Sequence, residues 1–129
     1  TNFTEAEIIP YATWSKKATL RFKAIGGGSS IIWDDGEVSI SAVTIDETIR
    51  AADKITFIKM DVEGAELESL KGAKKTIMQD KPKLAICIFH KPEDMVTIPL
   101  YIKELVPEYK LYVRHHSNST GETVLYAMT

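Results

Sequence analysis

The stretch that decides the fold spans residues 55–66 and reads ITFIKMDVEGAE. Its first half is a short apolar run with β-branched and aromatic residues, which predicts a buried strand. Beyond it, apolar residues recur at the spacing of one helix face, at Leu67, Leu70, Ala73 and Ile77. Three acids and a glycine lie between the two patterns. The stretch therefore predicts a strand, a tight turn and a helix, with carboxylates at the carboxyl end of the strand.

The acids of this turn have two possible roles. Ligands bind at the carboxyl edge of open parallel α/β sheets, which favours a functional site. Acids at a helix N-terminus also serve as caps and as partners of the helix dipole. The helix role explains Glu66 and Glu68 at least as well as a functional one. We expect Asp61, at the strand tip itself, to be functional.

Strands and helices alternate along the rest of the chain. Strands are expected at residues 7–10, 18–22, 37–43, 55–60, 83–89, 110–114 and 123–127, and helices at residues 44–52, 65–79 and 95–106. Alternating buried strands and helices predict a parallel sheet, and the last two strands can pair as an antiparallel hairpin. We expect one α/β domain over residues 1–129, in which a β-rich excursion (1–43) precedes an α/β core (44–129).

Local signals refine this outline. Thr44 followed by Glu47 is typical of a capping box, and Asp46 fits a first-turn helix acid better than a ligand. Gly72 lies inside the long predicted helix, where glycine costs on the order of 1 kcal/mol relative to alanine, so we expect a bend or a close backbone contact there. The glycine run at 26–28 lacks the spacing of a phosphate-binding loop, and we interpret it as a linker between strands.

Composition narrows the function classes. The 129 residues suffice for one domain with a core, and the net charge of −2 argues against a nucleic-acid or anionic-membrane partner. No apolar run is long enough to span a bilayer. The single cysteine, Cys87, fits a core side chain in a reducing compartment, so we predict a cytoplasmic location. The first residues are unlike a signal peptide and lack an initial Met, so we expect a fragment or a processed piece.

The pattern K-x-D-x-E-G-A-E over residues 59–66, followed by L-x-G-A over 70–73, resembles the signature of the FkbM-type methyltransferases. Thr44-Ile45-Asp46 before it, and Pro82 and His90 after it, also fall where that family places them. The resemblance implies a Rossmann-like, mostly parallel sheet with a C-terminal antiparallel hairpin. It also implies a SAM-dependent enzyme, where SAM is S-adenosylmethionine, that methylates a hydroxyl of a sugar or another small molecule. The family's glycine-rich cofactor loop has no counterpart here, so we expect a domain truncated at its N-terminus.

Methyl transfer from a sulfonium requires an aligned acceptor, a pocket with little water and often a base. We predict that Asp61 orients or deprotonates the acceptor, or faces the sulfonium. Lys59 lies two residues earlier on the same strand face and can pair with Asp61 or with Glu63. His90, at the tip of the next strand, can serve as the base or contact the acceptor, or can be a polar exit residue. These three residues, Lys59, Asp61 and His90, are the predicted catalytic set.

The predicted binding residues surround this set. Ala12 and Thr13, in the loop that follows the first expected strand, could edge the adenine of SAM, and Asp61 is the third predicted cofactor contact. Glu63 and Glu66 are expected to face the acceptor. A Mg²⁺ site built from Asp61, Glu63, Glu66 and His90 is the weaker interpretation, because the strand-to-helix turn leaves their geometry open. No metal is therefore predicted.

A second hypothesis is a non-catalytic module with a methyltransferase-like fold. An exposed sheet edge recruits other chains, so such a module could bind a partner or form a homo-oligomer through that edge. The two hypotheses differ in whether a glycine-rich cofactor unit precedes this stretch in the whole protein. The enzyme hypothesis is favoured because the acids lie at the strand tip.

Overall fold

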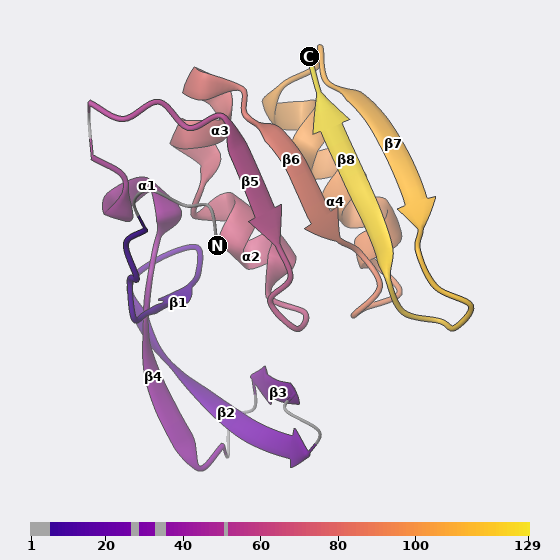
Figure 1. Cartoon of the computed structure of the whole chain (residues 1–129). Coiled ribbons are helices and arrows are strands. Elements are labelled where there is room, and N and C mark those ends of the chain that lie inside the picture. The colour runs from indigo at the N-terminus through magenta and orange to yellow at the C-terminus, as the bar shows by residue number, and fades with distance from the viewer. Residues whose placement is uncertain (1–5, 27–28, 33–35, 51) are drawn as a thin grey trace.

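The computed structural model describes residues 6–26, 29–32, 36–50 and 52–129 (Figure 1). The elements in chain order are β1 (Ala12–Thr13), β2 (Ala18–Gly26), β3 (Ser29–Ile32), β4 (Val38–Val43), α1 (Ile45–Thr48), β5 (Phe57–Met60), α2 (Glu66–Lys71), α3 (Lys74–Asp80), β6 (Lys83–Cys87), α4 (Asp94–Leu105), β7 (Lys110–His115) and β8 (Thr123–Met128). The strands form two four-stranded sheets. The predicted glycine linker at 26–28 falls largely outside the described residues.

The second sheet has the strand order β5-β6-β8-β7. Strands β5 and β6 are parallel, in the register Ile58 to Leu84, and helices α2 and α3 form the crossover between them. Strand β8 runs antiparallel to both β6 and β7, so the predicted C-terminal hairpin is confirmed. A mostly parallel sheet is not confirmed. Strand β8 inserts between β6 and β7, so β5–β6 is the one parallel pair described in this sheet.

Strand β1 joins the first sheet, whose order is β1-β4-β2-β3. It pairs parallel to β4 through Ala12 with Ala42 and Thr13 with Val43. The prediction of a strand at residues 7–10 and a loop after it was wrong, because the strand begins at Ala12. Pro10 has no backbone N–H to give to a ladder, and the segment before it lies in open solvent, with Ile8 89% exposed.

The core lies between the second sheet and its helices. Helices α2, α3 and α4 lie on one face of the sheet (Figure 1). Strand β5 was expected to be buried but is covered on one face only, so Ile58 and Met60 are buried against the helices while Phe57 and Lys59 are exposed on the other face. The fully buried side chains of this cluster are Leu70, Ala73, Ile77, Ile86, Ile98, Ile102, Leu125 and Ala127. No described helix is both long and apolar enough to cross a bilayer.

The long helix predicted over residues 65–79 is divided at Gly72. Helix α2 ends before this glycine, and α3 begins two residues after it. A Cβ atom at Gly72 would lie 2.0 Å from the carbonyl oxygen of Trp14, in the segment that follows β1. The backbone N–H of Asp46 also donates to the Gly72 carbonyl oxygen at 2.9 Å. Both expected reasons for the glycine, a bend and a close backbone contact, are therefore confirmed.

Asp46 connects helix α1 to helix α3. It lies in the first turn of α1, as expected, and the hydroxyl of Thr44 caps that helix by accepting from the Glu47 N–H. Its carboxylate also caps α3, accepting from the backbone N–H groups of Lys75 at 3.0 Å and Thr76 at 2.9 Å. Helix α3 has no cap from its own N-cap residue, so Asp46 supplies that function from a distant part of the sequence.

Candidate functional site

The carboxyl ends of β5 and β6 lie side by side because the two strands are parallel neighbours. Asp61 directly follows β5, and His90 follows β6 after two residues. Between β5 and α2 the chain turns through two residues in the left-handed region, Glu63 with φ of 54° and Gly64 with φ of 90°. A Cβ atom at Gly64 would lie 3.1 Å from Lys91 Cε. The turn is therefore packed directly against the loop that carries His90.

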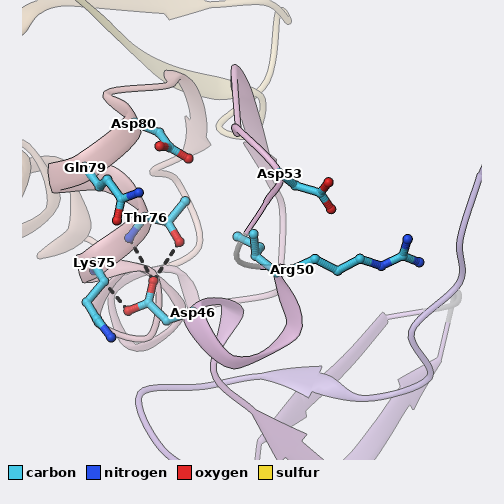
Figure 2. Close-up of a pocket in the computed structure, with 8 residues that line it drawn as sticks. Asp46, Arg50, Asp53, Lys75, Thr76, Gln79 and Asp80 are labelled. Atoms are coloured by element: carbon cyan, nitrogen blue, oxygen red, sulfur yellow. Dashed lines mark hydrogen bonds between the residues drawn. The ribbon is translucent and has the colours of Figure 1, made fainter.

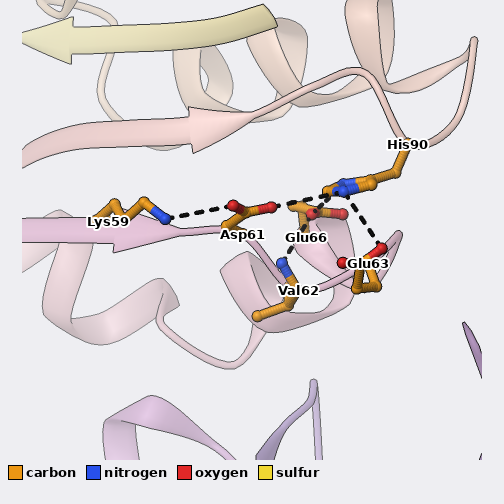
Figure 3. A network of polar contacts seen from close by, with 6 residues as sticks. All are labelled: Lys59, Asp61, Val62, Glu63, Glu66 and His90. Atoms are coloured by element: carbon orange, nitrogen blue, oxygen red, sulfur yellow. Dashed lines mark hydrogen bonds and ion pairs between the residues drawn. The ribbon is translucent and has the colours of Figure 1, made fainter. Parts of the chain in front are cut away.

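His90 is the centre of a polar network (Figure 3). Its Nε2 atom lies 3.5 Å from Asp61 Oδ1 and 3.6 Å from Glu63 Oε2. Its Nδ1 atom lies 2.7 Å from Glu66 Oε1, which is an ion-pair distance, although the two groups are not aligned as a hydrogen bond. The imidazole is 11% exposed, while Asp61 and Glu63 remain open to solvent. The predicted proximity of His90 and Asp61 is confirmed.

Glu66 is a fully buried acid in the wall of this network. Its Oε1 atom accepts from the backbone N–H of Val62 at 3.0 Å, and this bond closes the turn before α2. Its Oε2 atom has no hydrogen-bond partner among the described residues. A buried carboxylate with an unpaired oxygen is costly, so its presence requires compensation from the charge of a neighbour. Glu66 thus has a structural role in the turn and a contact with His90, while its predicted role toward the acceptor stays a prediction.

Asp94, in the first turn of α4, was missed by the sequence analysis. It is 3% exposed, and its Oδ2 atom has no hydrogen-bond partner among the described residues. Burial raises the pKa of this carboxyl, and the negative charge of Glu66 raises it further. The sequence feature that could have pointed to Asp94 is its position as an acid at the start of a helix, shortly after His90 at the end of a strand. That signal is weak, because most such acids are exposed dipole partners.

Lys59 pairs with Asp61, as the strand periodicity predicts. Its Nζ atom lies 3.3 Å from Asp61 Oδ2, whereas Oδ1 of the same carboxylate faces His90. Both side chains are largely exposed, so the ion pair contributes little to stability. Its effect is to orient the Asp61 carboxylate with one oxygen turned toward the imidazole.

Cys87, the last residue of β6, is buried and reduced. Burial raises the pKa of its thiol to about 12, and the negative charge of Asp61 adds to the shift. A thiol with this pKa is protonated at neutral pH and is a poor nucleophile. The interpretation of Cys87 as a core side chain is confirmed.

Thr13 and Glu68 have contacts that hold the first sheet on α2. The Thr13 hydroxyl lies 2.7 Å from the Ser69 hydroxyl, which also donates to the Thr13 carbonyl oxygen at 3.0 Å. Glu68 accepts from the Ser15 hydroxyl at 2.5 Å. These contacts support the structural role of Glu68. The predicted contact of Ala12 and Thr13 with the adenine of SAM stays a prediction.

A cleft of about 390 Å³ lies between α1 and α3, away from the strand tips (Figure 2). Its polar groups already serve the fold. Asp46 caps α3, and Asp80 Oδ2 accepts from the backbone N–H of Ile55 at 2.9 Å. Arg50 pairs instead with Glu7, 2.8 Å away. We therefore assign no ligand to this cleft and place the candidate site at the strand tips.

Comparison with known proteins identifies the family. Residues 4–119 match the family model of the Methyltransferase FkbM domain, so the match includes the acidic turn and the described strands from β1 to β7. The chain belongs to the FkbM methyltransferase family. The suspected relationship from the 59–66 signature is confirmed, and so is the coarser expectation of a mixed α/β methyltransferase fold.

A solved structure supports this assignment. The chain is similar to the crystal structure of Methyltransferase FkbM from Methylobacillus flagellatus KT, with a TM-score of 0.73 and 33% sequence identity. The similarity covers 91% of this FkbM chain but 27% of that protein. The chain thus corresponds to a minor part of the larger methyltransferase. No curated protein matches the chain.

Proposed function

We propose that the chain carries the acceptor side of a SAM-dependent O-methyltransferase site, at the carboxyl ends of β5 and β6. Membership of the FkbM family supports methyl transfer. The observation that carries the location is the 3.5 Å separation of Asp61 Oδ1 and His90 Nε2, with the imidazole largely buried and the carboxylate open to solvent. The acceptor is a hydroxyl of a sugar or another small molecule, which enters from the exposed side of Asp61.

His90 is the proton acceptor in this proposal, and Asp61 orients the hydroxyl. The negative charge of Glu66 beside Nδ1 favours a proton on that nitrogen, so Nε2 keeps its lone pair toward Asp61. A hydroxyl placed between Asp61 and Nε2 can donate to either and is deprotonated as its oxygen attacks. The proton taken by Nε2 then lies on a ring that Asp61, Glu63 and Glu66 surround. Lys59 keeps the second oxygen of Asp61 occupied.

The exposed carboxylates fit the cationic end of the cofactor. SAM, when bound, supplies an electrophilic methyl group on a positively charged sulfur. Asp61 and Glu63 are both partly open to solvent at the strand tip and offer negative charge to such a group. Their position at the carboxyl edge of the parallel pair agrees with where ligands bind in α/β sheets.

The test is methyl transfer from tritiated SAM to a panel of hydroxylated sugars, measured for the wild type, Asp61→Asn, His90→Gln and the surface control Glu104→Gln. Loss of a positioned base costs about 10²–10⁴-fold in rate, and we expect that loss in the two site variants only. Calorimetric titration with SAM and with S-adenosylhomocysteine reports cofactor binding separately. If this chain alone binds neither, the same variants are assayed in a longer protein that includes it. Near-normal transfer by both site variants would refute the assignment.

One observation favours a second candidate, a non-catalytic assembly module. Strand β5 is at the edge of its sheet, and Phe57 on it is 57% exposed. An open edge of this kind pairs readily with another strand. Sedimentation analysis of the wild type and of Phe57→Lys tests this candidate. A stable dimer that the substitution dissociates, together with no binding of SAM, would favour assembly over catalysis.

A further inference from the structure

Three side chains at the strand tips have the composition of a metal site. Asp61, Glu66 and His90 each offer one ligand atom, and these atoms all lie within 4.8 Å of one another. The residues come from three different places, the end of β5, the start of α2 and the loop after β6. Asp61 and His90 follow two strands that are paired in the sheet, and this pairing brings both donors to one edge of the sheet.

Proximity of acids alone does not make a site, and the decisive feature is Glu66. Its side chain is fully buried, and its Oε2 atom has no hydrogen-bond partner among the described residues. Figure 3 shows the Glu66 carboxylate beside the His90 ring and next to Asp61. The buried Nδ1 atom of His90 also lacks an aligned hydrogen bond. The network thus contains an unpaired carboxylate oxygen of Glu66 beside the His90 ring, whose Nε2 atom faces Asp61 Oδ1 at 3.5 Å.

With a neutral imidazole, the carboxylates around His90 outnumber the two nearby lysines, Lys59 at Asp61 and Lys91 at the Gly64 turn. Asp61, Glu63 and Glu66 all lie within 3.6 Å of one imidazole, which supplies at most one positive charge. Lys59 approaches the outer oxygen of Asp61 and leaves the inner oxygen, Oδ1, turned toward the ring. A divalent cation would neutralise this excess and fill the unused donor positions.

We propose that Asp61, Glu66 and His90 bind a divalent transition-metal cation, Mn²⁺ or Zn²⁺. The donor set selects this class, because imidazole suits transition metals, whereas Mg²⁺ and Ca²⁺ prefer sites made of oxygen alone. The buried Glu66 forms the inner wall, and the exposed side of Asp61 leaves coordination positions open to water or to a hydroxyl, as in catalytic metal sites.

This inference extends the proposed function without depending on it. A cation at this position would lower the pKa of a bound acceptor hydroxyl. In the metal-loaded site His90 is a ligand, so this effect takes the place of proton abstraction by His90. Binding of the cation itself requires neither SAM nor an acceptor. The sequence did not favour a metal, because the spacing D-x-E-x-x-E across a strand-to-helix turn does not fix the distances. The folded turn brings all three of these acids within 3.6 Å of His90.

The experiment is titration of the chelator-treated chain with Mn²⁺ and with Zn²⁺, followed by calorimetry and, for Mn²⁺, by the loss of the free-ion EPR signal. We expect one ion per chain for the wild type and for the control Glu104→Gln. Mutation of a residue that only supports a metal ligand already weakens affinity by about 10–100-fold, and we expect at least this loss for Asp61→Asn and His90→Gln. Asp61 is 40% exposed, so Asp61→Asn is expected to fold, and circular dichroism checks this.

Each outcome of these titrations either supports or overturns the metal site. No binding of either ion by the folded wild type overturns the proposal. Equal affinity in the wild type, Asp61→Asn and His90→Gln also overturns it, since the ions would then bind surface carboxylates elsewhere. One-to-one binding that both substitutions weaken supports it. The titrations contain no SAM, and the SAM titrations are repeated with EDTA present, so failure of the metal site and failure of the methyltransferase assignment are read from different measurements.

Discussion

Replacing Gly72 with alanine is expected to destabilise the protein, although alanine is the better helix former. At an exposed helix position the change would gain about 1 kcal/mol. The Gly72 backbone is right-handed, with φ of −73°, so the conformation itself is open to alanine. The new Cβ atom, however, would lie 2.0 Å from the Trp14 carbonyl oxygen, more than an ångström inside the 3.4 Å of ordinary contact.

The structure gives the magnitude of this effect. Overpacking of this kind costs about 1–3 kcal/mol. Displacing the Trp14 segment also strains the hydrogen bond from Trp14 N–H to the Val43 carbonyl and the bond from Asp46 N–H to the Gly72 carbonyl, each worth about 1 kcal/mol. These costs exceed the gain of about 1 kcal/mol in helix propensity. We therefore expect the free energy of unfolding to fall by roughly 1–3 kcal/mol.

Urea unfolding followed by circular dichroism measures this free energy. The matched control is Gly121→Ala, because a Cβ atom there meets only the Phe89 ring, at 3.7 Å, and Gly121 does not have positive φ. We expect the control to change stability by less than about 0.5 kcal/mol. Equal or greater stability of Gly72→Ala, with the control behaving as expected, would refute the view that Gly72 is required by the approach of Trp14.

Three further predictions follow from single contacts. Asp46→Ala is expected to lower the free energy of unfolding by roughly 1–2 kcal/mol in urea, because α3 loses the carboxylate that accepts from the Thr76 N–H; no change would show that α3 needs no cap. Cys87 is expected to resist a thiol-specific disulfide reagent in the folded chain and to react once urea unfolds it, and rapid labelling of the native chain would contradict its burial. Burial raises the pKa of Tyr109 from 10.0 to about 12. As the pH rises, the Tyr109 hydroxyl therefore loses its proton in the unfolded chain before it does so in the folded chain. The free energy of unfolding is expected to fall between about pH 10 and pH 12 for this reason. Tyr109→Phe should flatten that fall in alkaline unfolding curves, whereas an unchanged slope would assign it to other groups.

The sequence predicts which side chains meet at the candidate site, but it does not predict that two of the acids there are buried. Asp61 and His90 follow consecutive buried strands, and parallel pairing of such strands forces their tips together, so their contact could be expected from the sequence. The pairing of Lys59 with Asp61 follows from the two-residue strand period. The burial of Glu66 and Asp94 could not be expected, since the sequence does not show which side of a helix start is covered by α4 and the His90 loop.

The sequence by itself determined the local elements. Apolar periodicity and turn residues act over a few positions, so the β5–turn–α2 unit, the parallel β6 and the C-terminal hairpin could be placed without the fold. The tertiary structure alone decided the sheet order, in which β8 inserts beside β6, and the distant contacts at Gly72 and Asp46. These features depend on packing between segments that lie tens of residues apart. The packing energy depends on both surfaces together, so neither segment shows it in its own pattern of apolar residues.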